Sequence, residues 1–108
     1  MVKYLFAYHG DWRPEGKEEY EAVVKDWESW LTEFGTSIID AGNPVGPNLT
    51  VESDGTITKN GGSNPITGYG IFKASTSAEA TKIAKKCPIL STGGSVEFAE
   101  IFDVSQSG

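Results

Sequence analysis

The chain has 108 residues, 38% of them hydrophobic, with three Trp, four Tyr and five Phe, which suits one domain with its own core and leaves no room for two. Fifteen acidic against nine basic side chains give a formal net charge of −6, which repels phosphate backbones, so we expect no nucleic-acid partner. No segment approaches the roughly 18 consecutive apolar residues of a membrane span, so we expect no membrane partner either.

The first half of the chain predicts a strand, a helix and a second strand. Residues 2–8 are an aromatic and aliphatic run that ends before Gly10, typical of a buried strand. After Pro14, apolar residues recur at spacings of three and four, which predicts a helix that Gly35 ends. The apolar face of this helix consists of Tyr20, Val23, Val24, Trp27, Trp30, Leu31 and Phe34. A second strand begins at Ile38, and residues 40–48, DAGNPVGPN, predict a rigid turn, because proline fixes φ at two positions and glycine accepts the backbone angles of tight turns.

The second half predicts a hairpin, a strand, a helix and a closing strand. Residues 49–59, LTVESDGTITK, alternate apolar and polar side chains around Asp54-Gly55, a pair that suits a two-residue hairpin turn. Residues 67–75, TGYGIFKAS, predict a strand whose two glycines would let another backbone or a ligand come close. Thr76 and Glu79 have capping-box spacing, and Pro88 ends the helix they open. Residues 95–104 predict the closing strand.

This order of elements predicts an α+β fold, a ferredoxin-like split βαβ arrangement with an antiparallel sheet and two helices on one face. We expect one domain over residues 1–104 and a flexible tail over residues 105–108. In the closing strand, Val96, Phe98 and Phe102 would point one way, and Ala99 and Ile101 the other. Because both faces carry apolar groups, we expect a second copy to cover the free face and form a dimeric α/β barrel.

Cysteine and histidine usage bear on cofactors and location. Cys87 is the only cysteine and His9 the only histidine, so no intrachain disulfide can form and no structural zinc site of these ligands can be built. The apolar run at the start breaks at His9-Gly10-Asp11, unlike a signal peptide. We therefore expect a cytoplasmic protein with no metal and no cofactor.

Several motifs together resemble the YCII-related family of the dimeric α/β-barrel superfamily, over nearly the whole chain. They are KYLFAYHG, VVKDWESWLTEFG, DAGNPVGP, GSNPITGYGIF and, above all, TSAEATKIAKKCPILSTGGSVEFAEIF. The resemblance implies the barrel fold and a homodimer. Some members carry a His in the first helix and an Asp after the second, proposed as an acid–base dyad. Here His9 lies at the end of the first strand and Cys87 precedes the Pro, so that dyad is not carried over.

Two residues are candidates for acid–base catalysis. His9 lies where a strand gives way to a loop, and histidine side chains suit proton transfer near neutral pH. Glu97 would face the barrel interior together with Tyr69. The alternatives are a solvated His9 and a Glu97 that is exposed or joins a salt bridge.

Four residues are candidates for ligand binding: Trp12, Asp40, Asn43 and Tyr69. Trp12 would flank a ligand or pack at an interface. Asp40 and Asn43 would line a pocket at the strand ends, or bond nearby backbone groups as Asp and Asn commonly do in turns.

These residues leave several functions open. One is a homodimer that binds a small molecule at the sheet or dimer interface. Another is a cofactor-free isomerase, lyase or monooxygenase-like enzyme with His9 or Glu97 as acid or base, and a third is a purely structural domain. An enzyme of this kind needs a titratable pair, so a His9 beyond hydrogen-bond reach of every carboxylate and outside every cavity would favour binding or structure.

Overall fold

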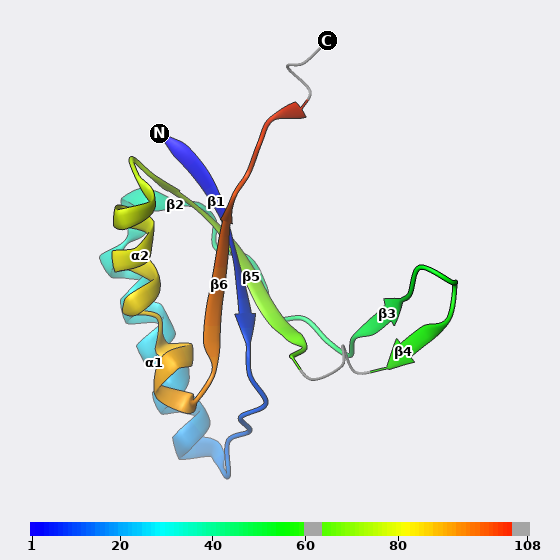
Figure 1. Cartoon of the computed structure of the whole chain (residues 1–108). Coiled ribbons are helices and arrows are strands. Elements are labelled where there is room, and N and C mark those ends of the chain that lie inside the picture. Colours follow the sequence, from blue (N-terminus) through cyan, green and yellow to red (C-terminus); the bar gives the residue numbers. More distant parts are fainter. Residues whose placement is uncertain (60–63, 105–108) are drawn as a thin grey trace.

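A four-stranded antiparallel sheet with two helices on one face forms the body of the protein, as the computed structural model shows (Figure 1). The structure describes residues 1–59 and 64–104. The elements are β1 (Val2–His9), α1 (Lys17–Glu33), the 3₁₀ helix η1 (Gly35–Ser37), β2 (Ile38–Asp40), β3 (Leu49–Val51), β4 (Ile57–Lys59), β5 (Ile66–Ala74), α2 (Ser77–Lys85), the 3₁₀ helix η2 (Pro88–Thr92) and β6 (Ser95–Glu100).

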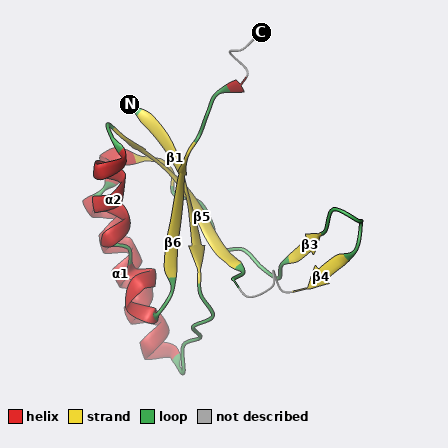
Figure 2. Ribbon diagram, viewed as in Figure 1, coloured by secondary structure: helices red, strands yellow, loops and turns green. Residues whose placement is uncertain are grey.

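The strand order of the main sheet is β2-β5-β1-β6, with every neighbouring pair antiparallel. β1 and β5 are therefore the two central strands, and both helices lie on the same side of them (Figure 2). This is the ferredoxin-like arrangement predicted from the sequence. β3 and β4 form a second sheet of their own, which projects from the body.

Side-chain alternation along β1 divides the sheet into two faces. Tyr4, Phe6 and Tyr8 are buried beneath the helices, whereas Leu5, on the opposite side, is 41% exposed. Residues directly opposite one another on paired strands share a face, so the register extends this division to β5 and β6. We call the side away from the helices the open face; it comprises Lys3, Leu5 and Ala7 of β1, Tyr69, Ile71 and Lys73 of β5, and Glu97 and Ala99 of β6.

Aromatic packing fills the space between sheet and helices. Phe6 and Phe72 are fully buried with ring centroids 4.5 Å apart, and Trp30 packs on Phe72 at 5.2 Å. The indole nitrogen Nε1 of Trp30 donates a hydrogen bond of 3.0 Å to the carbonyl oxygen of Ile83, which ties α1 to α2 inside the core. The second helix begins as predicted, because the Thr76 hydroxyl accepts a hydrogen bond from the Glu79 amide at 3.2 Å.

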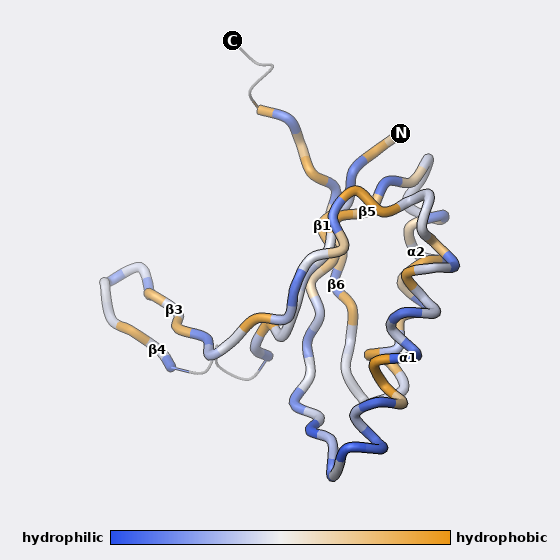
Figure 3. The backbone as a smooth tube through the Cα atoms, turned by 180° about the vertical axis from the view of Figure 1, so that it is seen from behind, coloured by the Kyte–Doolittle hydropathy of each residue, from blue (hydrophilic) through white to orange (hydrophobic). Residues whose placement is uncertain are grey.

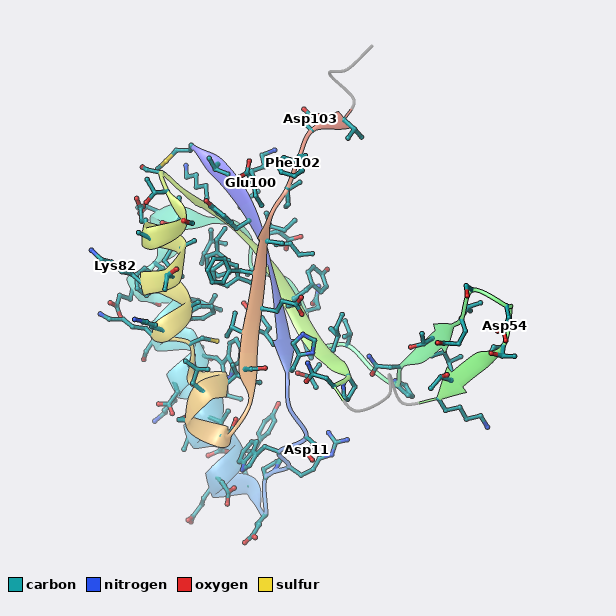
Figure 4. The ribbon with its side chains drawn as sticks, in the orientation of Figure 1. Asp11, Asp54, Lys82, Glu100, Phe102 and Asp103 are labelled. Carbon is teal, nitrogen blue, oxygen red and sulfur yellow. The ribbon has the colours of Figure 1, made fainter. Side chains whose placement is uncertain are left out.

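Three details differ from the sequence predictions. Phe102 does not join the core: it is 74% exposed, because β6 ends at Glu100, next to the start of its neighbour β1 (Figure 4). Tyr20 lies in the first turn of α1, beyond the sheet, and is 58% exposed. The hairpin turn has three residues between paired Glu52 and Thr56, with only Gly55 at positive φ, 90°.

The tail predicted for residues 105–108 lies outside the described residues. Among the helices of the described part of the chain, none combines the length and apolar character needed to cross a membrane.

We expect Trp30→Phe to lower the free energy of unfolding by about 2–3 kcal/mol, because it removes a buried hydrogen bond and leaves a cavity between α1 and α2. Trp27→Phe is the matched control, since Trp27 is only partly buried and its indole makes no hydrogen bond among the described residues. Urea unfolding followed by circular dichroism measures both, and equal losses would show that the bond to Ile83 is not what joins the helices.

Candidate functional site

The rigid loop predicted at residues 40–48 runs along the free edge of β5. The amide of Tyr69 donates to the carbonyl of Asn43 at 3.2 Å, and the amide of Val45 donates to the carbonyl of Thr67 at 3.0 Å. Pro44 lies directly opposite Gly68. The loop therefore continues the sheet beyond β2 along β5 before it leads into β3.

Glycines allow this close approach. Gly42 has φ of 75°, and a Cβ there would overlap the carbonyl oxygen of Tyr69. A Cβ on Gly68 would lie 3.2 Å from the Tyr8 ring and 3.3 Å from the Asn43 carbonyl. The prediction that glycines in this strand let another backbone come near is thus confirmed.

A pocket of about 430 Å³ lies between α1, β5 and this loop. Its wall is mainly apolar, and Trp27 meets Tyr8 edge to face in it with ring centroids 5.0 Å apart. The lining residues are Tyr8, Val24, Trp27, Glu28, Leu31, Ala41, Gly42, Asn43, Pro44, Thr67, Gly68, Tyr69 and Ile89. Glu28 is the one charged side chain in this described lining, and the chain as a whole is acidic, so the pocket disfavours anions.

Tyr8 lines the pocket and carries an unsatisfied polar group that lies beneath the wall. Its hydroxyl is buried and has no hydrogen-bond partner among the described residues, although buried hydroxyls normally have one. Burial raises the pKa of Tyr8 above its ordinary value, and nearby Cys87 adds to the effect. The hydroxyl therefore stays protonated and retains a hydrogen to donate.

Cys87 itself is a buried, neutral thiol. Burial raises its pKa to about 12, which keeps it from forming the thiolate that nucleophilic catalysis and metal binding require. No group of three or more potential metal ligands gathers among residues 1–59 and 64–104.

His9 and Glu97 form a pair on the open face, on the other side of the sheet from the pocket. Nε2 of His9 lies 3.0 Å from Oε1 of Glu97, although 88 residues separate them in sequence. His9 is 6% exposed, whereas the Glu97 side chain is 72% exposed in a single chain. The carboxylate that the acid–base hypothesis required is therefore within reach of His9, but neither side chain lines the pocket.

Both ring nitrogens of His9 face acceptors. Nδ1 lies 3.1 Å from the carbonyl oxygen of Asn64 and 3.2 Å from that of Pro65, while Nε2 faces the Glu97 carboxyl. Carbonyl oxygens only accept hydrogen bonds, so Nδ1 carries a hydrogen. A hydrogen bond between Nε2 and the Glu97 carboxyl requires a hydrogen on one of these two groups, so the geometry brings together two groups between which a proton can move.

Of the remaining candidates, two belong to the pocket lining and two do not. Asn43 and Tyr69 are part of the lining, although the Tyr69 side chain lies on the open face, where the Asn43 amide is 3.4 Å from the Tyr69 hydroxyl. Asp40 accepts a hydrogen bond of 2.8 Å from the Gly42 amide, so it holds the turn, and it does not line the pocket. Trp12 is half-buried between β1 and α1 and lies outside the lining as well.

Sequence reasoning missed the helix wall of the pocket. Val24, Trp27 and Leu31 fall on the apolar face of α1 and were assigned to the core. Their spacing does not indicate that a pocket separates them from the loop at residues 41–44. The sequence signal that could have indicated the pocket was the pair of glycines in GYG, residues 68–70, together with the rigid loop.

Comparison with known proteins identifies a structural likeness. No protein-family model matches the chain, and no curated protein matches it. A 5-chloro-2-hydroxyhydroquinone dehydrochlorinase (TftG) from Burkholderia phenoliruptrix, solved in complex with 2,5-dihydroxybenzoquinone, matches over 98% of both chains with a TM-score of 0.59 and 13% sequence identity. The chain thus shares the fold of this enzyme. Membership of the YCII-related family stays a prediction from the motifs.

We expect His9→Ala to lower the free energy of unfolding by about 1–3 kcal/mol, because it removes a buried ring that anchors the carbonyls of Asn64 and Pro65. Glu97→Ala should cost less than about 1 kcal/mol, since Glu97 is largely exposed. Glu97→Gln is the control that keeps the shape, because its amide can donate to Nε2 of a neutral ring. Chemical denaturation measures all three, and a loss in Glu97→Ala as large as in His9→Ala would contradict this ranking.

Proposed function

We propose that this protein is a homodimer that binds a small, neutral, planar organic molecule in the pocket between α1, β5 and the loop at residues 41–44. The observation that carries the proposal is the apolar pocket whose wall includes Tyr8, with the buried, unpartnered hydroxyl of this residue lying beneath the wall. A ligand that displaces part of the wall and places an oxygen near this hydroxyl would receive the hydrogen bond that the described residues do not supply.

The size and chemistry of the pocket support this class of ligand. Its volume of about 430 Å³ lies within the roughly 300–1,000 Å³ of known ligand pockets. Trp27 and Tyr8 offer aromatic surface for a flat ring, and Glu28 together with the net charge of −6 opposes an anion. The dehydrochlorinase of the same fold was solved with a flat, oxygen-bearing six-membered ring, which agrees in shape, though not in charge, with the molecule proposed here.

The open face supports the homodimer. Leu5, Ile39 and Ile101 are 41%, 45% and 38% exposed, although they belong to the sheet or directly continue it. The chain exposes 7545 Å², about 1,700 Å² more than the ~5,800 Å² of a compact monomer of this mass. A standard interface buries about 800 Å² per partner, which is less than this excess, although the excess belongs to the whole chain, with the projecting β3–β4 hairpin included. The dimeric α/β barrel and the cytoplasmic setting expected from the sequence belong to this proposal.

A second candidate function rests on the 3.0 Å contact between His9 and Glu97. A second copy on the open face would shield this pair from water and strengthen its electrostatics, as acid–base catalysis requires. The pair would then act in a cofactor-free isomerase, lyase or monooxygenase-like enzyme, with Glu97 or His9 moving the proton. Its ligand would lie inside the barrel, whereas the ligand of the main proposal lies on the helix side.

We expect hydroquinone, used as a neutral probe, to raise the melting temperature of the wild type, whereas the anionic 2,5-dihydroxybenzoate should raise it less. Tyr8→Phe should weaken hydroquinone binding up to about tenfold, the worth of one hydrogen bond, and should raise the unfolding free energy without ligand by about 1 kcal/mol. Tyr4→Phe is the control, because Tyr4 is equally buried on the same strand but lies outside the pocket lining.

Calorimetric titration and thermal unfolding measure these effects. Equal losses of affinity in the two Tyr variants, or no binding of neutral ring compounds to the wild type, would contradict the pocket. Loss of binding in Glu97→Gln with Tyr8→Phe unaffected would favour the second candidate.

The homodimer is tested by Leu5→Glu. This change places a charge at the centre of the open face without touching the core, so the dimer should dissociate while the fold is retained. Leu90→Glu is the matched control, because Leu90 is 42% exposed but lies in η2, in the helix layer. Light scattering should give twice the chain mass of 11.6 kDa for wild type and Leu90→Glu at micromolar concentration, and a wild type at 11.6 kDa would contradict the dimer.

A further inference from the structure

Residues 49–59, which we call the arm, form the isolated two-stranded sheet of β3 and β4. The arm stands away from the body, and Asp54 lies near its far end (Figures 1 and 4). Two-stranded hairpins are at best marginally stable alone in water, because they have no layer on which to bury a face. The arm therefore needs a surface to pack on.

One side of the arm is an apolar stripe of Leu49, Val51 and Ile57. Val51 lies directly opposite Ile57, and Leu49 is two residues from Val51, so the three share a face. They are 68%, 71% and 61% exposed, and hydrophobic stretches mark both strands of the arm (Figure 3). The other side carries the opposed pair Thr50 and Thr58. This is the pattern of a strand pair with one face prepared for burial.

The arm has a defined shape at its tip and at its base. At the tip, the Glu52 amide donates to the Thr56 carbonyl at 2.7 Å, and Asp54 accepts from the Thr56 amide and hydroxyl at 2.9 and 2.7 Å. At the base, the Asn48 side chain donates to the Ile66 carbonyl at 3.0 Å. The bonds at the tip define the shape of the hairpin, and the Asn48 bond ties its base to β5.

The arm and the open face border the same space. In Figure 1 the helices lie on one side of the main sheet, and the arm extends from the opposite side. A body packed on the open face would therefore lie within reach of the stripe.

We propose that the arm of each chain packs its apolar stripe against a second copy of this chain, so that two arms clasp the two bodies. The proposal rests on the homodimer proposed above. A second copy is the occupant because it presents the same two exposed apolar surfaces, and a two-fold arrangement covers both arms and both open faces at once. The surface surplus of the chain, about twice what a standard interface requires per partner, leaves enough area for the arms as well as the sheets.

The test removes the stripe and keeps the hairpin. The variant Leu49→Thr, Val51→Thr and Ile57→Thr retains β-forming residues but loses the apolar contact, and should raise the dimer Kd at least about 100-fold in sedimentation equilibrium. Thr50→Ser with Thr58→Ser alters the opposite face of the same arm and should leave Kd unchanged. Circular dichroism of both variants checks the body, whose core the arm does not enter.

Hydrogen exchange gives a second readout. Amides of residues 49–51 and 57–59 should exchange slowly in concentrated wild type and rapidly after dilution below Kd. If the wild type dimerises but the triple variant keeps the same Kd, or if arm amides exchange freely in the dimer, the arm proposal is overturned while the homodimer stands. A wild type that stays monomeric overturns both the homodimer and the arm proposal. The hydroquinone titration still tests ligand binding in the pocket, because that test does not depend on the dimer.

Discussion

Both helices lie on the same face of the sheet, and this one-sided cover governs the rest of the structure. As a result, the two sides of β1 differ. Tyr4, Phe6 and Tyr8 lie in the core, whereas Lys3, Leu5 and Ala7 lie on the open face. Burial of the first set drives folding through aromatic packing, anchored by the Trp30 bond to Ile83. Among residues 1–59 and 64–104, no helix covers the second set, so this uncovered surface is as informative about function as the core.

The same constraint separates two chemical environments across one sheet. On the helix side, Gly42 and Gly68 let the loop lie against β5. The loop and Trp27 of α1 form opposite walls of the pocket. On the open face, the pairing of β1 with β6 brings His9 to Glu97. The first site offers apolar surface, with an unused donor beneath it, which suits binding. The second offers two groups within hydrogen-bond distance, His9 and Glu97, which suits proton transfer.

The sequence predicted those features that depend on local periodicity and turn chemistry. Apolar spacing located α1, the Thr76 cap located α2, and Asp54-Gly55 located the hairpin. Features that depend on long-range register were not predictable. Strand alternation placed Phe102 on the same face as Val96 and Phe98, yet β6 ends before it, next to the start of β1. The His9 contact with Glu97 depends on strand pairing between residues that are 88 positions apart. The side of α1 that lines the pocket was read simply as the apolar face of a helix, because the spacing of apolar residues does not show whether they contact the core or a pocket.

Solvent accessibility of methyl groups, measured by NMR with a soluble paramagnetic agent at a concentration that favours assembly, tests the central claim most directly. If a second copy covers the open face and leaves the pocket free, methyl signals of Leu5, Ile71 and Ile101 should be protected, while those of Val24 and Leu31 stay accessible. Open-face methyl groups as strongly relaxed as those of the exposed Val45 would contradict the account.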